Sequence, residues 1–213
     1  MDPNIVQKIA YSVIPVILAI TLHEAAHGYV ANKLGDPTAR LLGRITANPL
    51  KHIDPIGTLL VPGLMLMTSG FLFGWAKPVP VAMNNLKRPI RDMGIVAAAG
   101  PASNIVMALI WALVLKLQIA TNIGHEFFVQ MALVGIMINL VLAALNLLPM
   151  PPLDGGRILV ALLPRPLGRV VSQIEPYGLF IMLALLFTGA LSTVLSPMIG
   201  LGQNIIFSLL GLN

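Results

Sequence analysis

The chain has 213 residues, of which 57% are hydrophobic and 10% are charged, with a formal net charge of +5 and no cysteine. A soluble domain carries about 25% charged residues, so this composition indicates an integral membrane protein and excludes an ordinary globular fold. The absence of cysteine excludes disulfides and thiolate metal ligands. The Lys and Arg lie between apolar stretches, where they are typical of topology signals and lipid contacts, and we expect no nucleic-acid partner.

The first apolar stretch, residues 5–31, contains His23, Glu24 and His27. At ~1.5 Å per residue it is long enough to cross a ~30 Å hydrocarbon layer, and we expect Pro15 to kink it. An unpaired charge in such a helix costs at least ~2.5 kcal/mol. Residues four apart share a helix face, so the two imidazoles can bind one metal ion while Glu24 holds a water beside it. This HExxH spacing is typical of zinc hydrolases, and we favour it over a chance match whose histidines bond neighbouring carbonyls.

Residues 37–56 form a mixed loop in which we interpret His52 as an ordinary histidine, since no second metal ligand accompanies it. Residues 59–73 are apolar but only 15 long and contain Pro62 and Gly63, which is short for a full crossing and predicts a re-entrant or interfacial segment.

The next segment, residues 74–83, is predicted to be a short extended β-type loop, because two prolines within 74–81 exclude a helix. At membrane depth an extended backbone must face protein or a cavity, so its residues Lys77, Pro78 and Val79 are candidates for holding an extended peptide by strand addition. A plain connector is the equally weighted alternative on residue chemistry alone.

Two further spans follow, over residues 94–115 and 127–148. The first carries Asn104, a buried amide that serves either as a link between helices or as a substrate contact. The second ends at Asn146 and runs into a proline-rich turn before Asp154, which precedes two glycines that permit backbone conformations other residues avoid. The alternative role for Asp154 is to cap a short following helix.

From residue 177 to the end there is no charge, and we expect Pro197 to divide this region into one full span and a shorter apolar tail. The prediction is an all-α polytopic membrane protein with four to six membrane segments. It forms a single domain over 1–213, with a core over about 5–163 and C-terminal membrane helices over about 175–212.

The loop charges distinguish two topologies. If residues 59–73 cross completely, the 13 Lys and Arg divide five to eight between the two sides, and Asp154 lies opposite the histidines. If they re-enter instead, one side carries 11 and the other only Lys8 and Lys116. The second division fits the positive-inside rule and lets the histidines and Asp154 meet near the cytosolic face.

This convergence predicts one zinc ion bound by His23, His27 and Asp154, with an open fourth position, which is the arrangement of a catalytic zinc site. Glu24 would take a proton from the attacking water and deliver it to the leaving amine. Asn104 or Asn146 would donate to the oxyanion or to the substrate chain.

Three stretches resemble the signature motifs of the site-2 protease family of intramembrane zinc metalloproteases, in the family's order: residues 23–27 (HEAAH), 99–104 (AGPASN) and 146–156 (NLLPMPPLDGG). The resemblance covers about residues 15–160. It implies zinc bound by His23, His27 and Asp154, Glu24 as catalytic base, Asn146 at the substrate, and residues 74–81 as the family's re-entrant β-loop.

The resemblance is to the compact form without a PDZ or CBS domain, and it implies a multi-pass protein of the cell membrane that cleaves transmembrane substrates. The main alternative is a membrane carrier that uses the same three ligands as a metal transit site, and a further one is a catalytically inactive metal-binding scaffold.

Overall fold

The computed structural model describes residues 3–52, 54, 77–121 and 125–212. This part of the chain is helical and contains no β-strand, as an all-α fold requires. The helices are α1 (Pro3–Lys33), α2 (Thr38–Leu41), α4 (Pro89–Thr121), α5 (Glu126–Asn146), α6 (Asp154–Leu162), α7 (Arg165–Ser172), α8 (Gly178–Phe187) and α9 (Ala190–Leu210), with 3-10 turns at Pro49–Lys51, Met83–Asn85 and Glu175–Tyr177.

Five stretches of the described chain are long and apolar enough to cross a membrane: 6–33, 89–121, 126–146, 165–187 and 190–210. This agrees with the predicted four to six segments of a polytopic membrane protein. The expected division at Pro197 is wrong, because Pro197 lies inside α9. The chain turns earlier, at Gly189, whose φ of 75° is left-handed and suits glycine.

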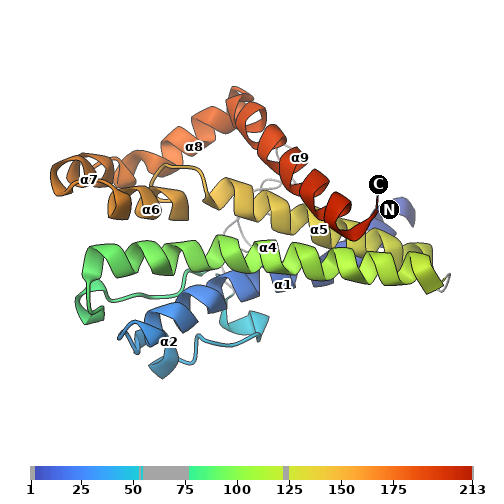
Figure 1. The fold of residues 1–213 in the computed structure, drawn as a ribbon, viewed down its shortest axis with the longest axis horizontal. Helices are drawn as coiled ribbons and strands as arrows, with labels where there is room; N and C mark the ends of the chain where they lie inside the picture. Colours follow the sequence, from blue (N-terminus) through green and yellow to red (C-terminus); the bar gives the residue numbers. More distant parts are fainter. Residues whose placement is uncertain (1–2, 53, 55–76, 122–124, 213) are drawn as a thin grey trace.

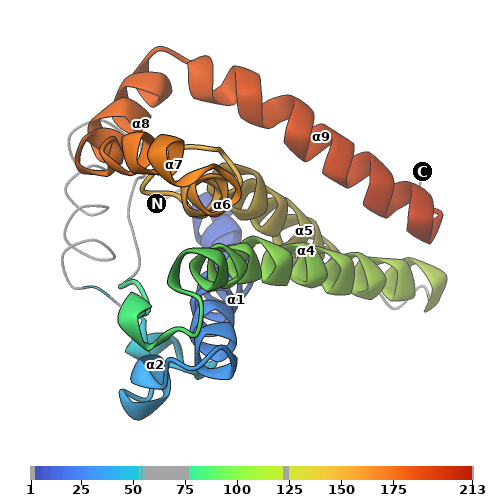
Figure 2. The ribbon, with the colours of Figure 1, turned by 60° about the vertical axis from the view of Figure 1, so that its left-hand side comes forward.

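Helices α1, α4 and α5 form the body of the protein, with α4 running beside both of the others (Figure 1). At the α4–α5 interface the smallest residue faces the largest one: a Cβ added at Gly135 would lie 2.4 Å from the Trp111 ring. Close approach of this kind replaces the hydrophobic effect as the source of helix association in lipid. From α5, the chain turns through α6, α7 and α8, and α9 then returns so that Ile206 joins the α4–α5 core (Figure 2).

The turn before α6 places the end of α5 against the start of α6. The glycines Gly155 and Gly156 are helical and do not have a positive φ, which corrects the expectation that they serve unusual backbone conformations. They provide space instead: a Cβ at Gly155 would lie 2.2 Å from the Leu148 carbonyl oxygen, and one at Gly156 would lie 2.3 Å from the Pro151 nitrogen. This close packing holds Asp154 at the first residue of α6.

The predicted re-entrant segment, residues 59–73, lies outside the described residues. Within the predicted β-type loop, residues 77–83 are described: residues 77–82 are neither helical nor part of a strand, and Met83 begins a 3-10 turn. Their conformation as a non-helical segment agrees with the effect of Pro78 and Pro80.

Candidate metal centre

Three ligand-type side chains from two distant parts of the chain converge at one point. The Nε2 atoms of His23 and His27 lie 3.1 Å apart. Asp154 Oδ2 lies 3.2 Å from the first and 3.3 Å from the second. Four ligands at ~2.0–2.1 Å around a tetrahedral zinc ion are separated by about 3.3 Å, so this triangle has the dimensions of one face of a zinc site. Within the described part of the chain, His23, His27 and Asp154 are the side chains placed closely enough to hold a metal ion together.

The chemistry of these atoms also fits a cation. His27 Nδ1 lies 2.8 Å from the Val96 carbonyl oxygen, which accepts only, so this nitrogen donates and leaves the Nε2 lone pair facing inward. His23 Nδ1 is likewise turned away from the centre, toward Asn104 Oδ1 at 2.6 Å. Asp154 Oδ2 is buried and has no hydrogen-bond donor. Three buried lone pairs that face one another repel, and a cation held between them relieves that repulsion.

Asp154 is not the N-cap of α6: it is the first helical residue, and the N-cap position is occupied by Leu153. His52 is buried in its loop, with Nε2 3.1 Å from the Thr46 carbonyl oxygen, and it lies outside the metal-binding group. This agrees with its interpretation as an ordinary loop histidine.

Gly100 of α4 packs directly against the two imidazole rings of the site. A Cβ at this position would lie 2.4 Å from His27 Nε2 and 2.6 Å from His23 Cε1. The absence of a side chain therefore leaves the space in which the two imidazoles face Asp154.

A Gly100→Ala variant is expected to stay helical, because alanine favours a helix, but to lose zinc affinity by more than about 100-fold. Zinc content after purification and circular dichroism measure the two effects. Gly200→Ala is the matched control, because its Cβ would meet nothing within 4 Å. Normal zinc binding by Gly100→Ala would contradict the conclusion that the imidazoles need the space left by this glycine.

Glu24 is half-buried, and its carboxylate is hydrogen-bonded to a backbone group from a distant part of the chain. Its Oε2 accepts a hydrogen bond of 2.7 Å from the Val79 N–H. The contact joins the helix that carries the histidines to the segment that sequence patterns single out as a candidate for substrate binding. Val79 is buried, whereas Lys77 and Pro78 are exposed.

Two buried charges fix this segment in place. The Arg44 guanidinium donates to the carbonyl oxygens of Lys77, at 2.9 Å, and Pro78, at 3.2 Å. Asp36, at the end of α1, accepts from the Ala82 N–H at 2.7 Å and from Asn85 Nδ2 at 2.9 Å. The segment is therefore anchored on both sides of the Val79–Glu24 bond.

The environment of Asp36 keeps it ionised. Burial opposes the charged form, but hydrogen bonds from Thr38, Asn85 and Ala82 outweigh it and lower the pKa of this carboxyl below its ordinary value of 3.8. The anchor is consequently present at any pH above that value and weakens only as the pH falls through the lowered pKa.

The other predicted substrate contacts occupy different surroundings. Asn104 is fully buried and bonds His23, Asn139 and the Ala19 carbonyl. Asn146 is the last residue of α5, is partly buried, and donates to the Leu142 carbonyl of its own helix at 3.0 Å.

Sequence reasoning missed the roles of Arg44, Asp36, Gly100 and Asn139. The first two look like ordinary loop charges, and their burial depends on a segment 33 to 49 residues away. Gly100 lies in a stretch of small residues that predicts close helix packing, and Asn139 lies within an apolar span; neither pattern indicates that Gly100 touches the histidines or that Asn139 touches Asn104.

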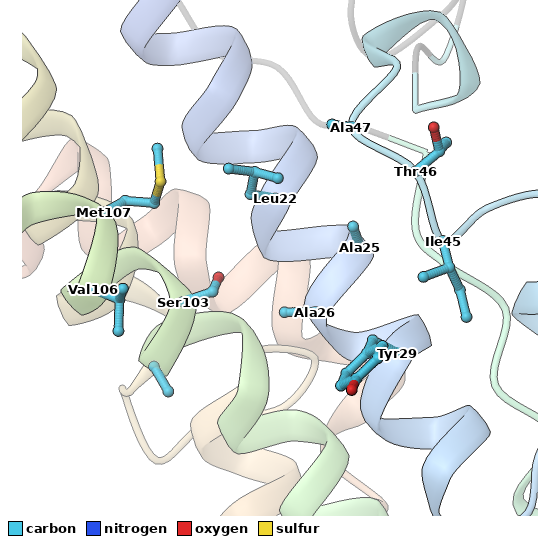
Figure 3. Close-up of a pocket in the computed structure, with 11 residues that line it drawn as sticks. Leu22, Ala25, Ala26, Tyr29, Ile45, Thr46, Ala47, Ser103, Val106 and Met107 are labelled. Carbon is cyan, nitrogen blue, oxygen red and sulfur yellow. The ribbon is translucent and has the colours of Figure 1, made fainter. Parts of the chain in front are cut away.

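A separate apolar groove of about 590 Å³ lies between α1, α4 and the loop at 45–47 (Figure 3). Leu22, Ala26 and Tyr29 line it from α1, and Ser103 and Met107 from α4. The groove is lined neither by Glu24 nor by any of the three metal ligands. The metal centre and the groove therefore occupy different faces of α1.

Residues 117–189 match peptidase family M50. The chain is 42% identical over 206 residues to "Putative zinc metalloprotease YwhC" of Bacillus subtilis, which covers 93% of this chain and 90% of that protein. It is 32% identical over 178 residues to the similarly named Rip2 of Mycolicibacterium smegmatis (83% of this chain, 66% of that protein).

A more distant relative is the zinc metalloprotease MJ0392 of Methanocaldococcus jannaschii, 26% identical over 155 residues, or 73% of this chain and 35% of that protein. No solved structure matches the chain significantly. The near full-length relationship, together with the membrane helices and a ligand group of zinc dimensions, shows that the chain belongs to peptidase family M50, the site-2 protease family of membrane zinc metalloproteases.

Proposed function

We propose that this protein is an intramembrane endopeptidase that hydrolyses peptide bonds within or next to transmembrane segments of other proteins. In this proposal His23, His27 and Asp154 hold one zinc ion and Glu24 is the general base. The observation that carries it is the buried triangle of three acceptor atoms with edges of 3.1, 3.2 and 3.3 Å, with Glu24 on the same helix turn.

When bound, the zinc ion supplies Lewis acidity, which polarises the scissile carbonyl and makes water acidic enough to react near neutral pH. Glu24 takes the proton that the attacking water releases as its oxygen bonds to the carbonyl carbon. It then delivers that proton to the amine nitrogen as the C–N bond breaks. The Val79 N–H occupies Oε2 of Glu24 and so orients the carboxylate, while Oε1 is the oxygen we assign to proton transfer.

We propose that residues 77–79 line the substrate site. Proline at 78 and 80 removes two N–H groups, and Arg44 holds the carbonyls of Lys77 and Pro78, so the segment resists forming a helix beside Glu24. A substrate helix must unwind before its carbonyls can be attacked, and a fixed non-helical segment next to the base is suited to receive an unwound chain. Asn146, beside the turn that precedes Asp154, is the proposed amide donor to substrate.

Arg44→Gln is expected to reduce kcat/KM for a transmembrane peptide about 10- to 100-fold, because a segment that touches the base loses its anchor. Zinc content should not change, since Arg44 contacts no ligand. Arg40→Gln removes the same charge from an exposed position of α2 and serves as the control. Equal losses in the two variants would indicate a general charge effect and contradict the anchoring role.

We further propose that the active site lies near the cytosolic face of the cell membrane. Contacts of His27 with Val96 and of Ala19 with Asn104 show that α1 and α4 run antiparallel. The connection between them therefore starts and ends on one side, the side that carries Asp154 and, with it, 11 of the 13 Lys and Arg. Accessibility labelling of a cysteine placed at exposed Arg40 tests this orientation, and labelling only from outside the cell would contradict it.

A further inference from the structure

A chain of buried amides extends from the metal centre into the middle of α5. Asn104 Nδ2 lies 2.8 Å from Asn139 Oδ1 and 3.2 Å from the Ala19 carbonyl oxygen. Asn139 Nδ2 lies 2.8 Å from the Gly135 carbonyl oxygen. Both asparagines have no exposed surface, so no hydrogen bond to bulk water competes with these contacts.

The direction of every bond in this chain follows from its ends. Backbone carbonyls only accept, so Asn139 must donate to Gly135 and present its oxygen to Asn104. Asn104 must then donate its two amide hydrogens to Asn139 and to Ala19. This leaves the Asn104 oxygen facing His23 Nδ1, at 2.6 Å.

The consequence is a fixed protonation pattern on the imidazole. An amide oxygen is an acceptor, so His23 Nδ1 must carry a hydrogen and Nε2 must present its lone pair to the Asp154 side of the site. A rotated Asn104 amide would place its oxygen against the Ala19 carbonyl and its NH₂ group against Nδ1, which loses two hydrogen bonds at a buried position.

We propose that Asn104 and Asn139 are positioning residues that set the tautomer of His23 and thereby the zinc affinity of the site. Asn104 has both donors occupied and is wholly buried, so this assignment replaces the substrate contact considered for it on sequence grounds. The proposal depends on the zinc site of the proposed function and is independent of peptide cleavage, so it can fail or succeed whether or not Glu24 acts as a base.

The test uses full-length protein in detergent, stripped with a chelator and titrated with zinc against a competing chromophoric chelator. Asn104→Leu is expected to weaken zinc binding about 10- to 100-fold, in the range for loss of an imidazole's outer partner. Asn104→Asp keeps an acceptor facing Nδ1 but loses the two donated bonds to Asn139 and Ala19, so it should be less stable than wild type and still bind zinc more tightly than Asn104→Leu. Ser103→Ala is the matched control: it removes one side-chain hydrogen bond, to the Gly100 carbonyl, from the adjacent position of α4.

A second readout reports the tautomer itself. The chain has four histidines, so nitrogen NMR of zinc-loaded, histidine-labelled protein can resolve the His23 ring. Wild type should show a Nδ1–H protected from solvent exchange, Asn104→Asp should keep it, and Asn104→Leu should lose the protection.

If Asn104→Leu does not fold, Asn139→Leu tests the same chain one residue farther from the metal, with an expected fall in zinc affinity smaller than that of Asn104→Leu. The proposal is overturned if Asn104→Leu, or Asn139→Leu in its place, has wild-type zinc affinity and an unchanged Nδ1–H signal. It is equally overturned if Asn104→Asp binds as weakly as Asn104→Leu, or if Ser103→Ala weakens binding as much.

Discussion

Glu24→Gln is expected to lower the cleavage rate of a transmembrane peptide by about 10²- to 10⁴-fold while the protein keeps its zinc. The glutamine retains an oxygen that can accept the Val79 N–H, so the segment at 77–79 should stay in place. What the variant lacks is a group that can take a proton from water. Cleavage of a labelled peptide by purified protein in liposomes, together with elemental analysis for zinc, measures both quantities.

The control for this variant is Glu126→Gln, which makes the same change at the exposed first residue of α5. It should cleave at the wild-type rate. A Glu24→Gln protein that binds zinc and cleaves normally would exclude the general-base role. A wild-type protein that transports zinc into liposomes and cleaves nothing would favour the membrane carrier instead, since a carrier would be little affected by loss of this base.

Asp154→Asn is expected to abolish cleavage because it removes a zinc ligand. Loss of an outer partner costs about 10- to 100-fold in metal affinity, so loss of a charged direct ligand should cost more than about 100-fold. The asparagine is close to the same size, and the packing of Gly155 and Gly156 against the turn should hold α6 in position. Chelator competition for zinc affinity and thermal unfolding of the zinc-free protein separate ligand loss from misfolding.

Asp92→Asn provides the comparison for that experiment. Asp92 is also a buried aspartate, and its carboxylate accepts a hydrogen bond of 2.8 Å from the Arg88 N–H at the start of α4. Its replacement keeps an oxygen that can accept this bond and removes only the negative charge in the first turn of α4, so it should lower stability by about 0.3–1 kcal/mol and leave zinc affinity unchanged. If Asp92→Asn lost zinc as strongly as Asp154→Asn, the effect would reflect general destabilisation of the site.

Local sequence patterns predicted much of this architecture because the lipid bilayer restricts which residues a spanning segment can contain. A spanning helix must satisfy its own backbone hydrogen bonds and expose apolar side chains, so α1, α4 and α5 can be recognised from composition alone. His23 and His27 could be paired for the same reason, since i and i+4 spacing on a helix requires no knowledge of the rest of the fold.

The errors arose where a residue type has two physical uses. Proline often ends a helix, but α9 continues through Pro197, because neighbouring groups can compensate for a missing hydrogen bond within a membrane helix. Glycine permits a positive φ, which Gly189 uses, but Gly155 and Gly156 have helical backbones and are required for close packing. Sequence shows the residue, whereas only its neighbours show which property is used.

Four features could be predicted without coordinates, because each depends on local spacing and composition: the membrane class of the protein, its long helices, the histidine pair and the motif that brings Asp154 into consideration. Tertiary structure decided the 3.1–3.3 Å triangle, the space left by Gly100, the anchoring of Lys77 and Pro78 by Arg44, and the amide chain behind His23. Apart from the His23–His27 edge, these contacts join residues 33 to 131 positions apart, and a contact between such partners depends on how whole helices pack. No local pattern encodes that packing.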